Sequence, residues 1–145
     1  MDNCNIRLAL FTDLDQVCEI EAESIKSWTY NQFAEELDRS FSCFIVAEKS
    51  GIITGYAIAW FIAGELQINS IAVKKDFRRH GIGRKLLDFL ISRYSSEILS
   101  ILYIEVRKKN TEALNFYKSY GLTETGLRKN YYGNDDAILM EKKFK

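Results

Sequence analysis

A basic segment at residues 74–85 constrains the fold of this chain more than any other part of its sequence. Six of its twelve residues are Lys or Arg, and one is acidic. An apolar run typical of a strand precedes it, and a run with the apolar spacing of a helix follows it. Two glycines, Gly81 and Gly83, let the backbone approach a ligand closely, and the start of a helix presents unpaired N–H groups. The segment therefore predicts an α/β fold with a phosphate or pyrophosphate site at this connection.

The glycine spacing excludes two common kinds of phosphate site. A P-loop needs Lys and then Ser or Thr after its last glycine, but Gly83 is followed by Arg84. A dinucleotide-binding fingerprint needs a third Gly or Ala at the position that Leu86 occupies. The pattern that remains is Arg78-x-x-Gly81-x-Gly83. Its alternative interpretation is a solvated basic turn that only precedes a helix.

Apolar runs and helical spacings predict a mixed α/β fold. Thr12 is expected to cap the first helix, a capping box of Thr29 and Gln32 begins the second, and Gly121 suits the end of the last. The first half of the sheet is expected to be largely antiparallel, and the two later helices connect strands as crossovers do. Strands are expected at residues 6–10, 43–48, 52–61, 65–73, 101–106, 127–132 and 137–142, and helices at 14–25, from 29, at 82–94 and at 110–120.

The strand expected at residues 65–73 changes phase. Leu66 and Ile68 occupy even positions, whereas Ile71 and Val73 occupy odd ones. Strict alternation would place the two pairs on opposite faces of the sheet. One extra residue between 68 and 71, a β-bulge, would restore a common face. A strand buried on both faces explains this segment equally well.

Composition limits the classes of function. The chain has 145 residues, which fits one domain of roughly 150. Lys plus Arg and Asp plus Glu are both 20, so the net charge of zero argues against a nucleic-acid binder that works by bulk charge. Three scattered cysteines and one histidine disfavour a zinc site or a disulfide framework. The longest apolar stretch, residues 52–63, is too short to span a membrane and no targeting segment is visible, so we expect a cytoplasmic protein.

Three polar residues in the second half of the chain are candidates for chemistry. Glu105 ends an apolar strand, where a carboxylate is costly unless it is paired, exposed or raised in pKa, and a carboxylate with a raised pKa is a good general base. Its alternative interpretation is a strand-end Glu that faces solvent or pairs with Arg107. Asn110 and Tyr117 also have ordinary interpretations, as an N-cap and a core aromatic residue. Their functional interpretation depends on order and spacing.

Taken in order, these motifs resemble the GNAT superfamily of N-acetyltransferases. The pattern Arg78-x-x-Gly81-x-Gly83 after a strand is similar to the acetyl-CoA signature of that superfamily. Residues 104–122 resemble the second half of its fold. The resemblance implies a mixed, mostly antiparallel central sheet flanked by about four helices, with a β-bulge in the central strand. It covers essentially the whole chain and implies a single N-acetyltransferase domain at residues 1–145.

Two further stretches resemble one branch of the superfamily, the RimI-type ribosomal-protein-alanine N-acetyltransferases. These stretches are Trp28-Thr29 and the two runs at residues 128–132 and 136–140. The implied reaction transfers acetyl from acetyl-CoA to the α-amino group of an N-terminal alanine, in small-subunit ribosomal protein number eighteen. No metal, direct nucleic-acid contact or membrane contact is implied, and we expect a monomer or weak dimer.

The resemblance also implies a role for each matching residue. Glu105 would be the general base, directly or through water, and Tyr117 the general acid that protonates the leaving thiolate. Backbone groups of residues 71–73 would hold the pantetheine arm and polarise the acetyl carbonyl, and the segment up to Arg84 would cradle the pyrophosphate. The implied cofactor-binding residues are Ile71, Ala72, Val73, Arg78, Arg79, His80, Gly81, Ile82, Gly83, Arg84 and Asn110, and the implied acceptor contacts are Trp28, Tyr131 and Tyr132.

The chain departs from the family pattern mainly where the family recognises its acceptor. Ser27 stands where a proline often precedes Trp28, and the loop at residues 133–135 is short and lacks proline. Leu122 also follows Gly121 where phenylalanine is common. Two alternatives therefore stay open. One is a GNAT enzyme that acts on lysine or on a small amine, and the other is a non-catalytic CoA-binding regulator.

Overall fold

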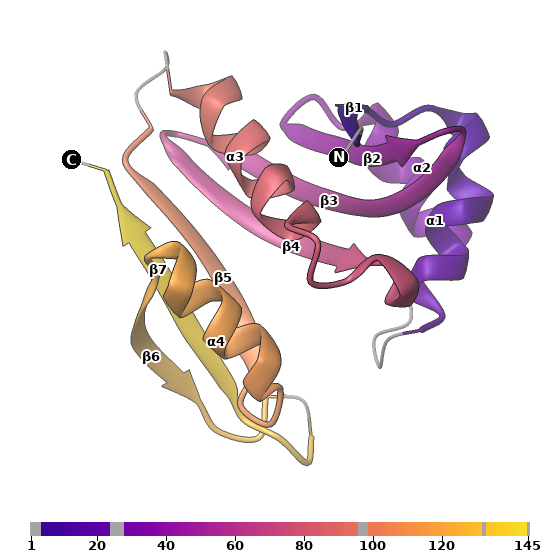
Figure 1. The fold of residues 1–145 in the computed structure, drawn as a ribbon. Coiled ribbons are helices and arrows are strands. Elements are labelled where there is room, and N and C mark those ends of the chain that lie inside the picture. The colour runs from indigo at the N-terminus through magenta and orange to yellow at the C-terminus, as the bar shows by residue number, and fades with distance from the viewer. Residues whose placement is uncertain (1–3, 24–27, 96–98, 132, 145) are drawn as a thin grey trace.

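A seven-stranded sheet organises the described part of this computed structural model, which comprises residues 4–23, 28–95, 99–131 and 133–144. The strand order is β1-β2-β3-β4-β5-β7-β6 (Figure 1). Neighbouring strands pair antiparallel except β4 and β5, which are parallel and are joined by the crossover helix α3. The elements are β1 (Asn5–Leu8), η1 (Phe11–Asp13), α1 (Leu14–Glu21), α2 (Tyr30–Asp38), β2 (Ser42–Lys49), β3 (Ile52–Ile62), β4 (Glu65–Val73), η2 (Lys75–Phe77), α3 (Ile82–Tyr94), β5 (Ile101–Arg107), α4 (Thr111–Tyr120), β6 (Thr123–Arg128) and β7 (Ala137–Lys143).

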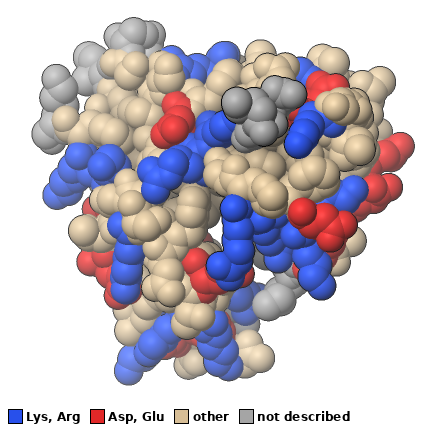
Figure 2. All heavy atoms as spheres, in the orientation of Figure 1, with Lys and Arg blue, Asp and Glu red and all other residues tan. Residues whose placement is uncertain are grey.

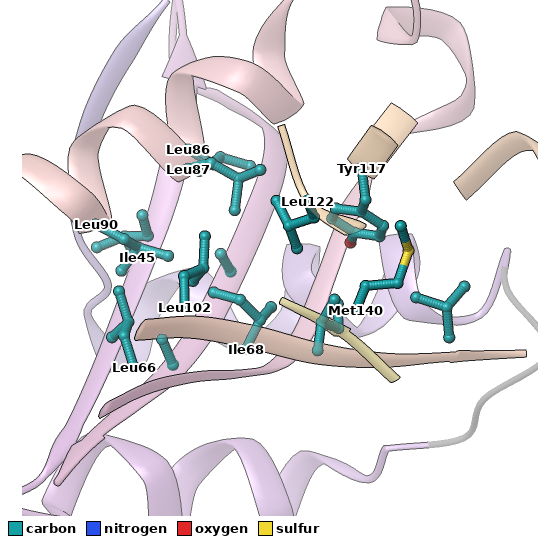
Figure 3. Packing of buried hydrophobic residues seen from close by; sticks show 14 of the residues in the cluster. Ile45, Leu66, Ile68, Leu86, Leu87, Leu90, Leu102, Tyr117, Leu122 and Met140 are labelled. Carbon is teal, nitrogen blue, oxygen red and sulfur yellow. The ribbon is translucent and has the colours of Figure 1, made fainter. Parts of the chain in front are cut away.

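Helices cover both faces of the sheet, and each face has its own core. On one face, α1 and α2 bury Leu14, Val17 and Phe33 against β2 and β3. On the opposite face, α3 and α4 pack over β3, β4, β5 and β7 (Figure 1). The mixed, mostly antiparallel α/β fold with four helices is therefore confirmed for the described residues. Figure 3 shows the second core, with Leu86, Leu87 and Leu90 of α3 near Ile45, Leu66, Ile68 and Leu102, and Tyr117 of α4 beside Leu122 and Met140.

The phase change in β4 is a β-bulge. Ser70 pairs with Ile58 of β3, but Ile68 pairs with the next residue, Ala59, so Asn69 is the extra residue. The bulge returns Ile71 to the face of Ile68, where both contact the α3–α4 core. The bulge prediction is therefore confirmed.

Several expected boundaries agree with the structure. The strand Glu65–Val73 and the helix Ile82–Tyr94 have the expected ends. The capping box is present as well, because Gln32 N donates to Thr29 Oγ1 at 3.1 Å and Thr29 N donates to Gln32 Oε1 at 2.8 Å.

The expected boundaries of two elements were wrong. The first helix begins at Leu14 after a 3-10 turn, so Thr12 is not its cap; it ends at Glu21, and residue 25 lies outside the described residues. Strand β6 begins at Thr123 instead of residue 127. Every residue of β6 is exposed, so no apolar alternation marks this strand in the sequence.

None of the described helices is long and apolar enough to cross a membrane.

Candidate active site

The two central strands separate in the middle of the sheet. The parallel ladder joins β4 to β5 only from Glu65↔Ile101 to Ile68↔Ile104. Beyond the bulge, residues 70–73 continue to pair with β3 but no longer with β5. Figure 1 shows β4 and β5 diverging there, and Figure 2 shows a hollow at this place with Lys and Arg atoms along its rim. The structure therefore places Ile71, Ala72 and Val73 at a strand edge that can bond a ligand.

The bulge residue also brings a buried donor to the opening. The side-chain Nδ2 atom of Asn69 is buried and has no hydrogen-bond partner among the residues that the structure describes. A buried donor without an acceptor is uncommon in a folded protein. A carbonyl of a bound substrate would supply the missing acceptor. The pattern of apolar residues pointed to a bulge but did not single out Asn69.

The start of α3 has the backbone of an anion site. Arg79 and Gly81 have positive φ angles of 66° and 81°, and Gly81 is the N-cap of α3 without a side-chain cap. Consecutive N–H groups in such a turn converge on one point, and the helix dipole adds positive potential there. A Cβ at Gly81 would meet nothing within 4 Å, so the turn is open to a ligand. These features fit the pyrophosphate of acetyl-CoA.

The side chains of the basic segment have separate partners. Arg78 Nε donates to the carbonyl of Val73 at 2.9 Å, which ties the segment to the end of β4. Arg79 lies 3.8 Å from Glu112 of α4. Arg84 stacks over the ring of Tyr120 at 5.0 Å. His80 is exposed and Ile82 is buried. The backbone of this segment, more than its cations, therefore forms the candidate cradle.

Gly83 and Asn110 have structural roles that the ligand-based expectation did not include. A Cβ at Gly83 would lie 3.1 Å from Cζ of Phe116, so this glycine allows α3 to approach α4 closely. Asn110 is the N-cap of α4, and its Oδ1 atom accepts from the N–H of Ala113 at 3.1 Å. The N-cap interpretation of Asn110 is therefore confirmed. Asn110 is exposed at the start of α4.

Glu105 lies on the face of β5 opposite the α3–α4 core. Its neighbours Ile104 and Val106 belong to that core, so alternation places Glu105 on the face that α1 and α2 cover farther along the sheet. These helices lie over the β1–β4 half, which leaves this face of β5 open (Figure 1). The carboxylate is 23% exposed and lies 3.1 Å from Arg128 Nε. Glu105 thus forms an ion pair with Arg128 of β6.

Tyr117 lies on the other face. Its side chain is buried in the α3–α4 core, beside Leu122 and Met140 (Figure 3). Burial raises the pKa of the Tyr117 phenol above its usual value, so the hydroxyl remains protonated at neutral pH. The strand pair β4–β5 thus separates a carboxylate on one face from a phenol on the other.

The expected acceptor contacts lie on the face of Glu105. Trp28 stacks on Phe33 with ring centroids 5.2 Å apart. Tyr131 is 49% exposed, and the guanidinium of Arg128 lies 5.1 Å from its ring centre. Arg128 therefore joins Tyr131 to Glu105, a link that the sequence interpretation missed. Tyr132 lies outside the described residues.

Two backbone-to-carboxylate hydrogen bonds hold this part of the site together. Asn130 N donates to Asp136 Oδ1 at 2.8 Å, and Lys109 N donates to Asp135 Oδ2 at 3.2 Å. The first bond closes the β6–β7 connection, and the second ties that connection to the turn that begins α4. In the part of the chain that the structure describes, no group of His, Cys, Asp and Glu residues could hold a metal ion.

Comparison with known proteins identifies the family. The sequence model of the acetyltransferase (GNAT) family matches residues 8–122. A Bacillus subtilis protein, provisionally assigned as a [ribosomal protein bS18]-alanine N-acetyltransferase, is 36% identical over 140 residues, which cover 94% of this chain and 91% of that protein. The Escherichia coli K12 [ribosomal protein bS18]-alanine N-acetyltransferase is 33% identical over 134 residues, covering 89% and 90%.

The fold agrees with this relationship. The crystal structure of the ribosomal-protein-S18-alanine N-acetyltransferase from Escherichia coli superposes with a TM-score of 0.88 at 30% identity, and the match covers 97% of this chain and 93% of that one. The resemblance to the RimI type is therefore confirmed at the level of family. The chain belongs to the GNAT acetyltransferase family and is an acetyl-CoA-dependent N-acetyltransferase.

Proposed function

We propose that this enzyme acetylates the α-amino group of an N-terminal alanine and that its acceptor is ribosomal protein bS18. The observation that carries the proposal is the position of Glu105, a partly exposed carboxylate on the open face of β5, linked through Arg128 to Tyr131. In this proposal the base lies beside a candidate peptide contact. The similarity to bS18-alanine acetyltransferases over about nine tenths of the chain favours the same acceptor. The proposed enzyme is one domain, residues 1–145, acting in the cytoplasm as a monomer or weak dimer.

The acceptor amine must lose a proton before it can attack a thioester. An α-amino group has a pKa of about 7.7–8.0, and a lysine amine about 10.4. Neutralising a lysine therefore costs roughly 3.4 kcal/mol more, at 1.36 kcal/mol per pKa unit. One carboxylate base, Glu105, directly or through water, is sufficient for an α-amine. This argument favours the N-terminal acceptor over lysine.

The proposed donor side lies at the other end of the opening. When bound, acetyl-CoA supplies the activated acetyl thioester. Backbone groups of Ile71, Ala72 and Val73 hold the pantetheine arm and orient the acetyl carbonyl, and the turn at residues 79–84 holds the pyrophosphate. Tyr117, on the α3–α4 face, donates its hydroxyl proton toward the leaving sulfur. The thiol of a typical leaving group has a pKa near 8.5, below the pKa of the buried Tyr117 phenol. A hydrogen bond from the Tyr117 hydroxyl is therefore enough to stabilise the leaving thiolate.

Two matched peptides test this function. One has a free N-terminal alanine and no lysine, and the other has a blocked N-terminus and one internal lysine. We expect acetylation of the first peptide, located by mass spectrometry after incubation with acetyl-CoA. Preferential acetylation of lysine would overturn the proposed acceptor while leaving the family assignment intact. Absence of transfer to either peptide, together with retained CoA binding, would also contradict the proposal and would favour a small-amine acceptor or a regulatory role.

A further inference from the structure

One buried carboxylate on the acceptor face has no part in the chemistry proposed above. Glu21, the last residue of α1, is only 4% exposed. Its Oε1 atom accepts from the hydroxyl of Tyr56 at 2.6 Å, and its Oε2 atom accepts from the backbone N–H of Trp28 at 3.2 Å. In the sequence, Glu21 was only one residue of the helix expected at residues 14–25. The structure shows that it bridges two different parts of the fold.

The hydrogen bonds continue from Glu21 to the bulge of β4. The hydroxyls of Tyr56 and Ser70 are 2.7 Å apart, and Tyr56 and Ser70 are both buried. The single hydroxyl proton of Tyr56 is donated to Glu21 Oε1. Ser70 must then donate to Tyr56. The result is a directed chain in which Ser70 donates to Tyr56, Tyr56 donates to Glu21, and the Trp28 N–H donates to the same carboxylate.

This chain of hydrogen bonds joins the acceptor side of the proposed site to the acetyl side, and the two sides must be correctly placed relative to each other for transfer. Ser70 follows the bulge residue Asn69 and precedes the strand edge proposed to orient the acetyl carbonyl. Trp28 is the proposed acceptor contact on the same face as Glu105. A second bond supports the same connection, because Lys75 N, just beyond β4, donates to Glu23 Oε1 at 3.0 Å. Glu21 and Glu23 thus bond the end of α1 to Tyr56 of β3 and to Lys75 beyond β4.

A comparison within the chain argues that Glu21 is more than a core contact. Glu36 of α2 is equally buried, at 4%, and also bonds a Trp and a Ser, through Trp60 Nε1 at 2.7 Å and Ser42 Oγ at 2.8 Å. Glu36 is additionally paired with Arg39 at 3.2 Å, in a part of the fold away from the opening. Burying a carboxylate is costly, so each must be held by strong interactions. Only the bonds of Glu21 converge on the proposed acceptor contact and the bulge.

We propose that Glu21 is a positioning residue for the acceptor. Through Tyr56 and Ser70, it holds Trp28 in a fixed position relative to the β4 bulge. This proposal rests on the proposed function in taking Trp28 as an acceptor contact. Glu21 contacts neither the reacting atoms nor the site of the pyrophosphate, which lies on the side of α3. Loss of its bonds should therefore weaken acceptor binding and leave acetyl-CoA binding unchanged.

Glu21→Gln is the informative substitution. Glutamine retains one acceptor oxygen but places an NH2 group at the other position, where it would face either the Tyr56 hydroxyl or the Trp28 N–H. The shorter bond to Tyr56 will retain the oxygen, so the bond to Trp28 is lost. A hydrogen bond to a charged group supports about a tenfold to 100-fold effect on binding. We expect the KM for the alanine peptide to rise by this factor and the KM for acetyl-CoA to change less than about twofold.

Two further variants make the test specific. Glu36→Gln removes an equally buried carboxylate away from the opening and should leave both KM values unchanged. Tyr56→Phe keeps the buried ring and removes only the hydroxyl that joins Glu21 to Ser70; it should raise the peptide KM about two- to tenfold. Tyr56→Phe also keeps the test available if Glu21→Gln does not fold. Amide hydrogen exchange at Trp28, read by NMR without substrates, should be at least about tenfold faster in Glu21→Gln and unchanged in Glu36→Gln.

The outcomes separate this proposal from the proposed function. Equal increases in both KM values, or an increase in Glu36→Gln as large as in Glu21→Gln, would show that Glu21 is only structural. An unchanged peptide KM and unchanged exchange at Trp28 would overturn the positioning role. If the wild-type enzyme instead prefers lysine or a small amine, the α-amine proposal fails by itself. The KM values for the acceptor and for acetyl-CoA are then compared with the amine that the enzyme accepts. Amide exchange at Trp28 tests its hydrogen bond to Glu21 in either case.

Discussion

Gly81 provides a quantitative test of the pyrophosphate site because Gly51 is a matched control. Both residues have a φ of +81°, and a Cβ at either position would meet nothing within 4 Å. Replacement by Ala therefore changes the backbone preference and creates no clash at either place. A left-handed conformation costs a residue that carries a Cβ roughly 1–2 kcal/mol.

The same conformational cost should lower the stability of the free protein at Gly51 and the affinity for CoA at Gly81. Gly51 lies in the hairpin turn between β2 and β3, where the paired strands hold the turn in place. Gly51→Ala should therefore lower the free energy of unfolding by about 1–2 kcal/mol and Tm by about 2–8 °C. Gly81 lies in an exposed loop, which can relax in the free protein. Bound CoA must then restore the left-handed turn, so Gly81→Ala should weaken CoA binding about 5- to 30-fold with a smaller change in Tm.

Titration calorimetry with CoA and scanning calorimetry of the free proteins measure both quantities. The reasoning requires that Gly51→Ala retain wild-type CoA affinity. The reasoning would be refuted if Tm decreased equally in the two variants while both bound CoA with wild-type affinity. In that case the left-handed turn at Gly81 would serve the fold and not the ligand.

Three further predictions concern the proposed chemistry. Glu105→Gln should lower kcat about 100-fold or more, with CoA affinity unchanged by calorimetry. The control Glu141→Gln, on the same sheet face, should retain activity. An equal loss of kcat and CoA affinity in Glu105→Gln would contradict the base assignment. Because burial raises the pKa of Tyr117 above about 10, kcat should not decline between pH 7 and 10 through its ionisation, and a decline in that range that disappears in Tyr117→Phe would show otherwise. Arg128→Gln should raise the peptide KM about two- to fivefold through loss of its stacking on Tyr131, and an unchanged peptide KM in steady-state assays would argue against this link.

Much of the fold could be predicted because its signals are local. The capping box at Thr29 depends on two residues that are three positions apart, and the apolar period of residues 82–94 is complete within one helix. The bulge was visible in one strand, because a single extra residue reverses side-chain alternation. The start of strand β6 could not be predicted, because the strand is exposed along its whole length and only its pairing with β7 defines it.

The candidate site was predicted in part. Its motif residues were found because the superfamily's spacing links Arg78, Gly81, Glu105 and Tyr117 along the chain. Their placement on two faces of the separated strands depends on where the β4–β5 ladder stops. The resemblance also did not show that Gly83 packs against Phe116 or that Asn110 is mainly a helix cap.

The sequence by itself determined the order of elements, the basic turn before α3 and the family, since each is encoded in spacing along the chain. It indicated the bulge in β4, and the pairing with β3 decided it. The tertiary structure alone decided which distant side chains meet. Arg128 reaches Glu105 across a sheet order in which β7 lies between their strands, and Glu21 reaches Tyr56, 35 residues away, through the packing of α1 on β3. Such partners carry no local pattern, because their proximity results from pairing and packing between elements that are remote in sequence.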